Sequence, residues 1–142
     1  MRLSSPDFKA GEEIPKKFTC HGEDINPELV IEEIPPGTQS LALIVDDPDA
    51  PGKTWVHWVV YNIPVSRKIE RNSIPGDQGM NDFERKNFGG PCPPSGVHRY
   101  FFKLFALDTH LDIEDANKQK LLDAMEGHIL AKAELIGLFS KP

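Results

Sequence analysis

Five side chains with acid–base or hydrogen-bonding chemistry stand beside turn-rich segments of this sequence. They are Asp47, Asp49, His57, His98 and Tyr100. Imidazole and phenol groups can donate hydrogen bonds to an anion, and a nearby carboxylate would orient an imidazole and favour its charged form. Backbone N–H groups around Gly89 and Gly90 could add further donors. These residue types predict a small pocket for an anion such as phosphate or carboxylate, provided that the fold brings them together.

The two aspartates belong to residues 46–51, which hold three carboxylates and two prolines. Proline cannot donate to a β-ladder, so the preceding strand must end here. Taken alone, this composition is typical of a solvated turn. Beside His57 and His98 it can instead form the rim of a site, with Asp47 pointing inward and Asp46 facing solvent or ending the strand. Asp49 would then either cap backbone N–H groups or touch the ligand.

Two other chemistries use the same residues. Two histidines and one aspartate could bind a metal ion, although their spacing matches no compact metal motif. Cys92 with His57 or His98 could form a nucleophile–base pair, although no cysteine-protease signature and no Gly-x-Ser-x-Gly elbow is present. The sequence therefore favours a binding protein over an enzyme, with no cofactor and no resident metal.

Three apolar stretches, at 40–45, 55–63 and 96–107, are expected to be the strands that position these residues. Strict alternation in the 55–63 stretch would place Trp55, His57, Val59 and Tyr61 on one face. Shorter strands are expected at 16–20 and 29–31, and residues 1–15 and 65–97 read as irregular. From residue 112 apolar residues recur at helical spacing, which predicts short C-terminal helices with Asp112 or Asp115 as a cap. These apolar residues are Leu121, Leu122, Met125, Ile129, Ala133 and Ile136.

Strands first and helices last predict a mainly β fold, an α+β domain or a β-sandwich, in a single domain over residues 1–142. The net charge of −6 argues against nucleic acid as a partner. The longest apolar run is too short to span a membrane, and no signal-peptide core is visible, so a cytoplasmic location is expected. Cys20 and Cys92 could pair, but reduced thiols are the expectation in that compartment.

Several motifs in chain order resemble the phosphatidylethanolamine-binding protein family, also called the Raf kinase inhibitor protein family. They are Asp47-Pro48-Asp49-Ala50-Pro51, Trp55-Val56-His57-Trp58, Gly90-Pro91-Cys92-Pro93-Pro94 and Gly96-Val97-His98-Arg99-Tyr100. The short length and the Gly-Pro-Cys-Pro-Pro form are similar to the bacterial and archaeal branch of the family.

The resemblance implies a β-sandwich of two antiparallel sheets with peripheral C-terminal helices. It also implies a pocket for phosphate-like groups, lined by Asp47, His57, His98 and Tyr100, with Pro51 and the 91–94 loop, including Pro91, on its rim. Members of the family inhibit kinases or serine proteases and are not established as enzymes. The resemblance therefore implies a phosphorylated headgroup as ligand, a kinase or protease as partner, and a homodimer. Protease inhibition through surface loops, independent of the pocket, is the alternative.

Overall fold

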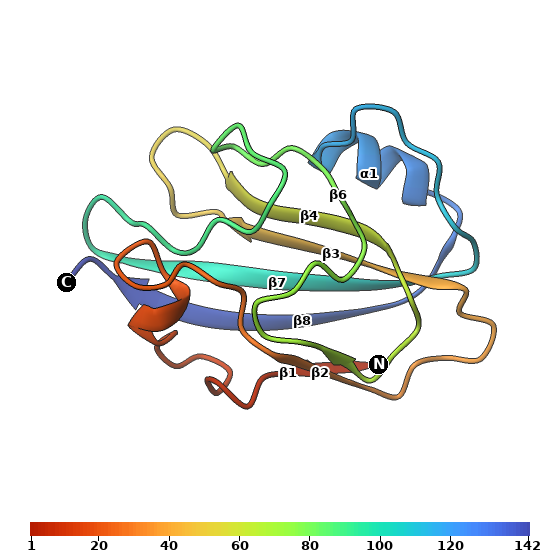
Figure 1. Cartoon of the computed structure of the whole chain (residues 1–142), viewed down its shortest axis with the longest axis horizontal. Coiled ribbons are helices and arrows are strands. Elements are labelled where there is room, and N and C mark those ends of the chain that lie inside the picture. Colours follow the sequence, from red (N-terminus) through yellow and green to blue (C-terminus); the bar gives the residue numbers. More distant parts are fainter.

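The fold is described from a computed structural model that covers residues 1–142. Its centre is a five-stranded antiparallel sheet made from the three long apolar stretches and two further strands (Figure 1). The strand order is β6 (Asp77–Gln78), β4 (Trp55–Ile63), β3 (Ser40–Asp47), β7 (Val97–Leu107) and β8 (Ile129–Ser140). Every residue of β3 is buried, as expected for a central strand that is apolar on both faces.

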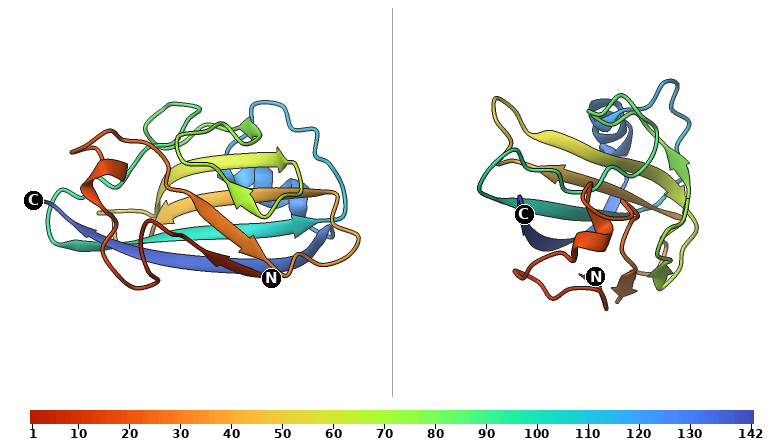
Figure 2. Two further views of the ribbon diagram at one scale, coloured as in Figure 1. Left: turned by 60° about the horizontal axis from the view of Figure 1, so that its bottom comes forward. Right: turned by 60° about the vertical axis from the view of Figure 1, so that its left-hand side comes forward.

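A small antiparallel sheet covers one face of the large one. Its order is β1 (Arg2–Ser4), β2 (Leu29–Glu32) and β5 (Lys68–Ile69), and the views in Figure 2 show it as a separate layer. A core of 19 buried residues fills the space between the two sheets. The predicted sandwich of two antiparallel sheets is therefore confirmed.

The opposite face of the large sheet is covered by α1 (Lys118–Met125), over a second core of 11 buried residues. Asn117 caps this helix, because its side-chain oxygen accepts a hydrogen bond from the backbone N–H of Lys120 at 2.9 Å. The predicted caps, Asp112 and Asp115, precede the helix without capping it. No helix in the structure is both long and apolar enough to cross a membrane.

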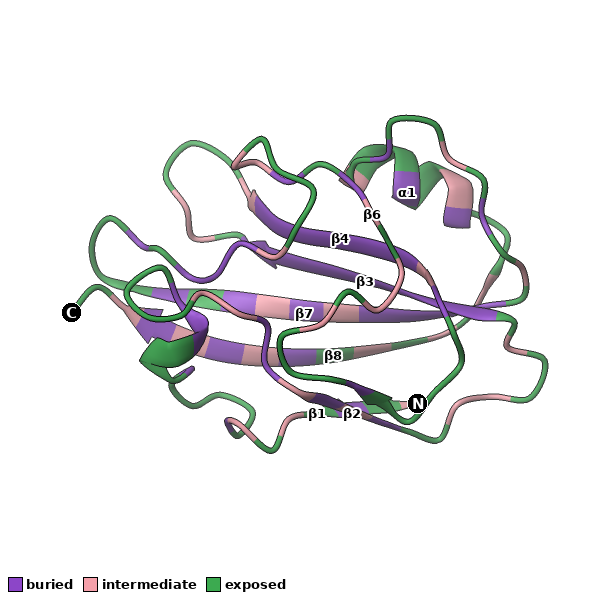
Figure 3. Ribbon diagram, viewed as in Figure 1, coloured by how far each residue is buried: buried purple, intermediate pink, exposed green.

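The second predicted C-terminal helix is wrong, because residues 129–140 form strand β8. Its apolar residues satisfy a period of two as well as a helical period, and Leu135, Gly137 and Phe139 are buried on the side of the inter-sheet core. Pairing decides between the two periods: β8 runs along β7 from Val97↔Ser140 to Leu107↔Ile129. The alternation of buried and less buried residues along β8 is visible in Figure 3.

Two shorter expectations are also corrected. Residues 16–20 do not form a strand; Pro15 is followed by a 3-10 turn, η1 (Lys16–Phe18), closed by a hydrogen bond from Thr19 N–H to the Lys16 carbonyl. The N-terminal region is not wholly irregular, since it contains β1. Its residues 11–14 also hydrogen bond to β8, where Glu13 forms an isolated bridge with Leu138.

Of the two places predicted for Asp46, the strand end is the correct one: Asp46 lies at the end of β3, and its side chain is fully buried and does not face solvent. It points toward the α1 side of the sheet, where Oδ2 accepts hydrogen bonds from Lys103 Nζ at 3.0 Å and Lys118 Nζ at 2.8 Å. The second oxygen, Oδ1, has no partner. A buried carboxylate is stable only with such compensation, so this pair of lysines ties α1 and β7 to the end of β3.

We expect Lys118→Met to lower the free energy of unfolding by about 1–3 kcal/mol, because it leaves a buried carboxylate with only Lys103. Lys120→Met is the matched control on the same helix, since Lys120 is exposed and its ammonium donates only to the Glu114 carbonyl. The control should change stability by less than about 0.5 kcal/mol. Urea unfolding of both variants measures the difference; equal losses would show that the Asp46 contact is not important for stability.

Candidate ligand-binding site

A cavity of about 360 Å³ opens at the end of the inter-sheet core, where β3 ends and where β4 and β7 begin. It contains five of the eight residues predicted from the sequence. These are Asp47, Pro51, His57, His98 and Tyr100. The remaining walls are made by Ala50, Trp55, Phe83, Cys92, Pro93 and Pro94. The cavity is thus apolar around a small polar floor, which is the usual composition of a small-molecule site.

Asp47 and His98 form a buried hydrogen-bonded pair on that floor. His98 Nδ1–H donates to Asp47 Oδ2 at 2.6 Å, and both side chains are more than nine-tenths buried. Asp47 Oδ1 accepts from the backbone N–H of Asp49 at 2.7 Å, which fixes the carboxylate in the turn. Because Nδ1 of His98 is engaged, Nε2 is the nitrogen left for a ligand.

His57 reaches the pocket from a β-bulge in β4. Val45 pairs with Trp58 and Asp46 pairs with Val56, so His57 is an extra residue between the two pairs. The strict alternation predicted for β4 is therefore wrong: Trp58 packs in the inter-sheet core, whereas Val56 packs toward α1. Bulges often redirect a side chain next to a functional site.

The His57 ring is held from several sides. Nδ1–H donates to the Gly89 carbonyl at 2.8 Å, which again leaves Nε2 free, and the ring packs against the edges or faces of Phe83 and Tyr100. Burial lowers the pKa of His57, while the Gly89 carbonyl and, more weakly, the Asp47 carboxylate oppose that change. Removal from water dominates, so the neutral imidazole is favoured in the free protein.

Tyr100 carries the one fully buried polar atom of the pocket that lacks a partner. Its hydroxyl is buried and makes no hydrogen bond within the protein, although the Asp47 carboxylate and the Cys92 backbone lie near it. Burial, with the repulsive Asp47 charge, raises the pKa of Tyr100, so the group stays a neutral O–H donor. Buried hydroxyls without a partner are uncommon in native proteins and call for an explanation.

Asp49 does not line the cavity. It fixes the turn at the rim to β7. It accepts hydrogen bonds from Arg99 through the backbone N–H, Nε and Nη2, each at 2.9 Å. These bonds from Arg99 hold the pKa of Asp49 at about 2. Of the two roles predicted for Asp49, the structure supports the loop-holding one.

Gly90 and Pro91 were predicted as ligand contacts, but neither lines the cavity. Gly90 N–H donates to Asp24 Oδ1 at 2.7 Å, and Gly89 N–H donates to the His57 carbonyl at 3.0 Å. The predicted nest of backbone donors is therefore already occupied. Gly90 is glycine for space, because a Cβ there would clash with the carbonyl oxygen of Phe18.

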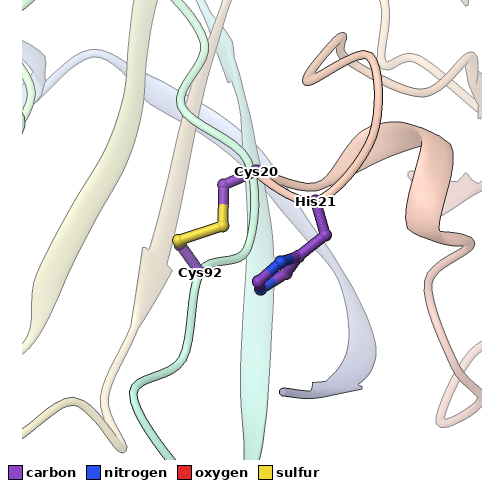
Figure 4. A group of neighbouring side chains, drawn as sticks. All are labelled: Cys20, His21 and Cys92. Atoms are coloured by element: carbon purple, nitrogen blue, oxygen red, sulfur yellow. A yellow bond between two sulfur atoms is a disulfide. The ribbon is translucent and has the colours of Figure 1, made fainter. Parts of the chain in front are cut away.

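The expectation that Cys20 and Cys92 are reduced thiols is also wrong, because the two residues form a disulfide (Figure 4). The two cysteines are separated by 72 positions, yet their Cα atoms lie 5.5 Å apart. Their number and the expected compartment carried no information about this proximity, which the fold creates. With its sulfur bonded, Cys92 has no thiol to act as the nucleophile considered above.

The metal alternative is not supported by the geometry of the pocket. Both oxygens of Asp47 are used, and the ligand atoms of Asp47, His57 and His98 do not cluster closely enough for one ion. Phe83 is a lining residue that the sequence did not reveal. It lies in the 65–97 stretch without periodicity, and only its aromatic type distinguished it there.

Comparison with known proteins decides the family. The family model for phosphatidylethanolamine-binding protein matches residues 4–140. The chain belongs to the phosphatidylethanolamine-binding protein family. A UPF0098 protein of Methanothermobacter thermautotrophicus is 48% identical over 99% of both chains, and one of Aquifex aeolicus is 47% identical over 99% of this chain and 89% of its own.

Solved structures of family members have the same fold. A homologue of phosphatidylethanolamine-binding protein from Chlamydia trachomatis superposes with a TM-score of 0.95 at 41% identity, covering 99% of this chain and 97% of its own. YbcL of E. coli, described as a new member of the mammalian family, superposes with a TM-score of 0.90 at 32% identity, covering 99% and 98%. The bacterial and archaeal character expected from the short chain is confirmed by these relatives.

For this family member we expect Tyr100→Phe to leave the free energy of unfolding unchanged or to raise it by up to about 1 kcal/mol. The substitution removes a buried hydroxyl that has no partner. Ser40→Ala is the contrasting variant, since the buried Ser40 hydroxyl donates to the Thr109 carbonyl at 2.6 Å. It should cost about 1 kcal/mol in the same urea titration. A loss for Tyr100→Phe as large as that for Ser40→Ala would mean that the Tyr100 hydroxyl is bonded in the free protein.

The depressed pKa of His57 predicts acid sensitivity. The unfolded chain takes up the His57 proton near pH 6.5, whereas the folded chain does so only at lower pH. The contribution of neutral His57 is thus present above pH 6.5 and is lost as the pH falls from 6.5 through the folded pKa. Unfolding free energies at about pH 7 and about pH 5 should therefore differ less in His57→Gln than in the wild type, while His110→Gln, at an exposed site, keeps the wild-type difference. An unchanged difference in His57→Gln would contradict this assignment.

Proposed function

We propose that this protein is a non-catalytic ligand-binding protein whose pocket takes a small anion, such as phosphate or a phosphorylated headgroup. The observation that carries the proposal is the Tyr100 hydroxyl, a buried donor without a partner in the cavity wall. Beside it are His57 and His98, each with Nδ1 used by the protein and Nε2 free. An oxyanion would supply the acceptor that all three groups lack.

The charge of the pocket limits how tightly an anion can bind. No lysine or arginine lines the cavity, and Asp47 brings a negative charge to its floor. Protonation of His98 would neutralise that charge within the hydrogen-bonded pair, and protonation of His57 would add a net positive charge. We therefore propose weak binding that depends on the protonation of the imidazoles.

The apolar walls of the cavity would favour ligands that carry an apolar portion beside the anionic group. Trp55 and Phe83 lie edge to face at 5.7 Å between ring centroids, and three prolines and an alanine complete the mouth of the cavity. A ligand with an anionic head and an apolar or methylene-rich portion would use both parts of the cavity. The family name refers to a lipid with such a headgroup, which makes phosphorylethanolamine a suitable second probe.

The proposal of binding without catalysis is supported by what the polar groups already do. Cys92 is in a disulfide, and the N–H groups of Gly89 and Gly90 are bonded within the protein. A nucleophile with its base and a set of oxyanion donors is therefore not assembled at this pocket. Regulation of a kinase or a serine protease, and formation of a homodimer, stay predictions from the family resemblance.

Titration with phosphate, followed by NMR, should shift the imidazole signals of His57 and His98 and leave that of exposed His110 in place. Affinity should be highest at low pH and fall as the pH rises through the lowered pKa of His57, below its ordinary 6.5. Tyr100→Phe should weaken binding roughly tenfold, the effect of losing one hydrogen bond to a charged group. Phosphorylethanolamine in place of phosphate tests whether the apolar wall adds affinity.

Pocket imidazole signals that stay fixed up to high phosphate concentration would exclude the proposed anion site. Equal phosphate affinity in Tyr100→Phe and the wild type would place the anion away from the floor of the cavity. Equal shifts of His110 and the pocket histidines would indicate only a general effect of ionic strength.

A further inference from the structure

A second group of reactive side chains lies beside the pocket and shares only the wall residue Cys92 with it. Its sulfur and imidazole atoms take no part in the proposed anion site. Cys20, His21 and Cys92 bring their potential ligand atoms within 4.8 Å of one another, and this is the one such group of three in the structure. All three residues are exposed. In Figure 4 the His21 ring lies beside the disulfide, on the same loop as Cys20.

We propose that reduction of the Cys20–Cys92 disulfide converts this group into a metal site, with two thiolates and one imidazole as ligands. In the oxidised protein the two sulfurs are bonded to each other and cannot act as thiolates. In the reduced protein they offer the soft donors that zinc prefers, and His21 adds the common nitrogen donor. The site would thus be open to metal only in the reduced state.

The two loops do not depend on the disulfide alone for their proximity. The Cys20 N–H donates to the Pro91 carbonyl at 3.1 Å, and the Gly90 N–H donates to Asp24 Oδ1 at 2.7 Å. Gly90 also lies against the backbone of Phe18 so closely that no side chain would fit. These contacts keep both thiols side by side after reduction, so the ordering cost of a metal site is largely met beforehand.

The His21 ring lies within reach of the two sulfurs, and its nitrogens are not used by the protein. Its ring stacks on Phe139 of β8, with 6.2 Å between ring centroids and an interplanar angle of 30°. Its backbone N–H is fixed by the Thr19 hydroxyl at 3.2 Å, while neither ring nitrogen makes a hydrogen bond within the protein. An exposed imidazole with both nitrogens free is available to a metal ion.

The distances suit a small tetrahedral ion after modest side-chain movement. With Zn–S of about 2.3 Å and Zn–N of about 2.0–2.1 Å, neighbouring ligand atoms on zinc lie roughly 3.5–3.8 Å apart. The sulfurs must separate to that distance on reduction, and the imidazole must approach them from within 4.8 Å. Three protein ligands leave the fourth position to water.

The reaction balances with an external dithiol as reductant. The disulfide gains two electrons and two protons to give two thiols, and the dithiol is oxidised to its own disulfide. Zinc then displaces both thiol protons, so metal affinity should rise with pH. In the reverse reaction a small-molecule disulfide, such as the oxidised dithiol, accepts the two electrons and is reduced to its thiol form. The ion is released and the Cys20–Cys92 disulfide is restored.

The test compares zinc binding by the oxidised and the reduced protein, independently of phosphate. A phosphine reductant is suitable, because it takes an oxygen atom from water to form the phosphine oxide and adds no competing thiolate. Zinc titrated against a chromophoric chelator should bind tightly to the reduced chain at one ion per chain, and not at this group in the oxidised chain. Cobalt(II) should give thiolate charge-transfer bands and the intense visible bands of a tetrahedral site.

His21→Ala should weaken zinc binding to the reduced chain by at least about 100-fold, since it removes a direct ligand. His110→Ala, another exposed histidine, is the matched control and should bind zinc as the wild type does. The double variant Cys20→Ser and Cys92→Ser should bind no tight zinc under either condition, and the reduced wild type serves if this variant fails to fold.

Three results would each overturn the proposal. They are equal zinc affinity in the oxidised and reduced protein, an unchanged affinity in His21→Ala, and unfolding of the chain on reduction as seen by circular dichroism. The last result would show that the contacts between the loops cannot hold the thiols together without the disulfide.

Discussion

Three carboxylates within four residues must each find a positive or hydrogen-donating partner, and all three find one on β7. Asp46 is paired with Lys103, Asp47 with His98 and Asp49 with Arg99. The exposure of the carboxylates rises along this series, from fully buried at Asp46 to partly exposed at Asp49. Since buried charge without a partner is costly, these contacts set where β3 ends relative to β7 and thereby where the pocket forms.

Part of the site was predictable from the local sequence alone. Asp47, His57, His98 and Tyr100 could be predicted as pocket residues, because their types and the motifs around them indicate polar groups beside a turn. Long apolar stretches likewise identified β3, β4 and β7. In these cases the structure that the local sequence favours is also the one that the surrounding fold stabilises. A single sequence is then sufficient for a correct prediction.

The wrong predictions share a different cause. In each case the structure of a segment depends on its contacts with a segment distant in the sequence. The 129–140 segment fits a helix and a strand equally well, and its register with β7 selects the strand. The bulge at His57 exists only relative to β3, and the disulfide only relative to a loop 72 positions away. Gly90 was assigned to the ligand by type, whereas Asp24, far from it in sequence, takes its N–H.

The cavity is the end of the inter-sheet core that the small sheet leaves uncovered, with Tyr100 belonging to both. Its floor comes from the ends of long strands, and its walls come from Trp55 at the start of β4 and from loops outside the strands. Floor and walls can consequently diverge at different rates. Exchange of the 50–54 or 91–96 loops would change the shape of the cavity mouth while the polar floor and the folding core persist, so one scaffold can carry cavities of different shapes.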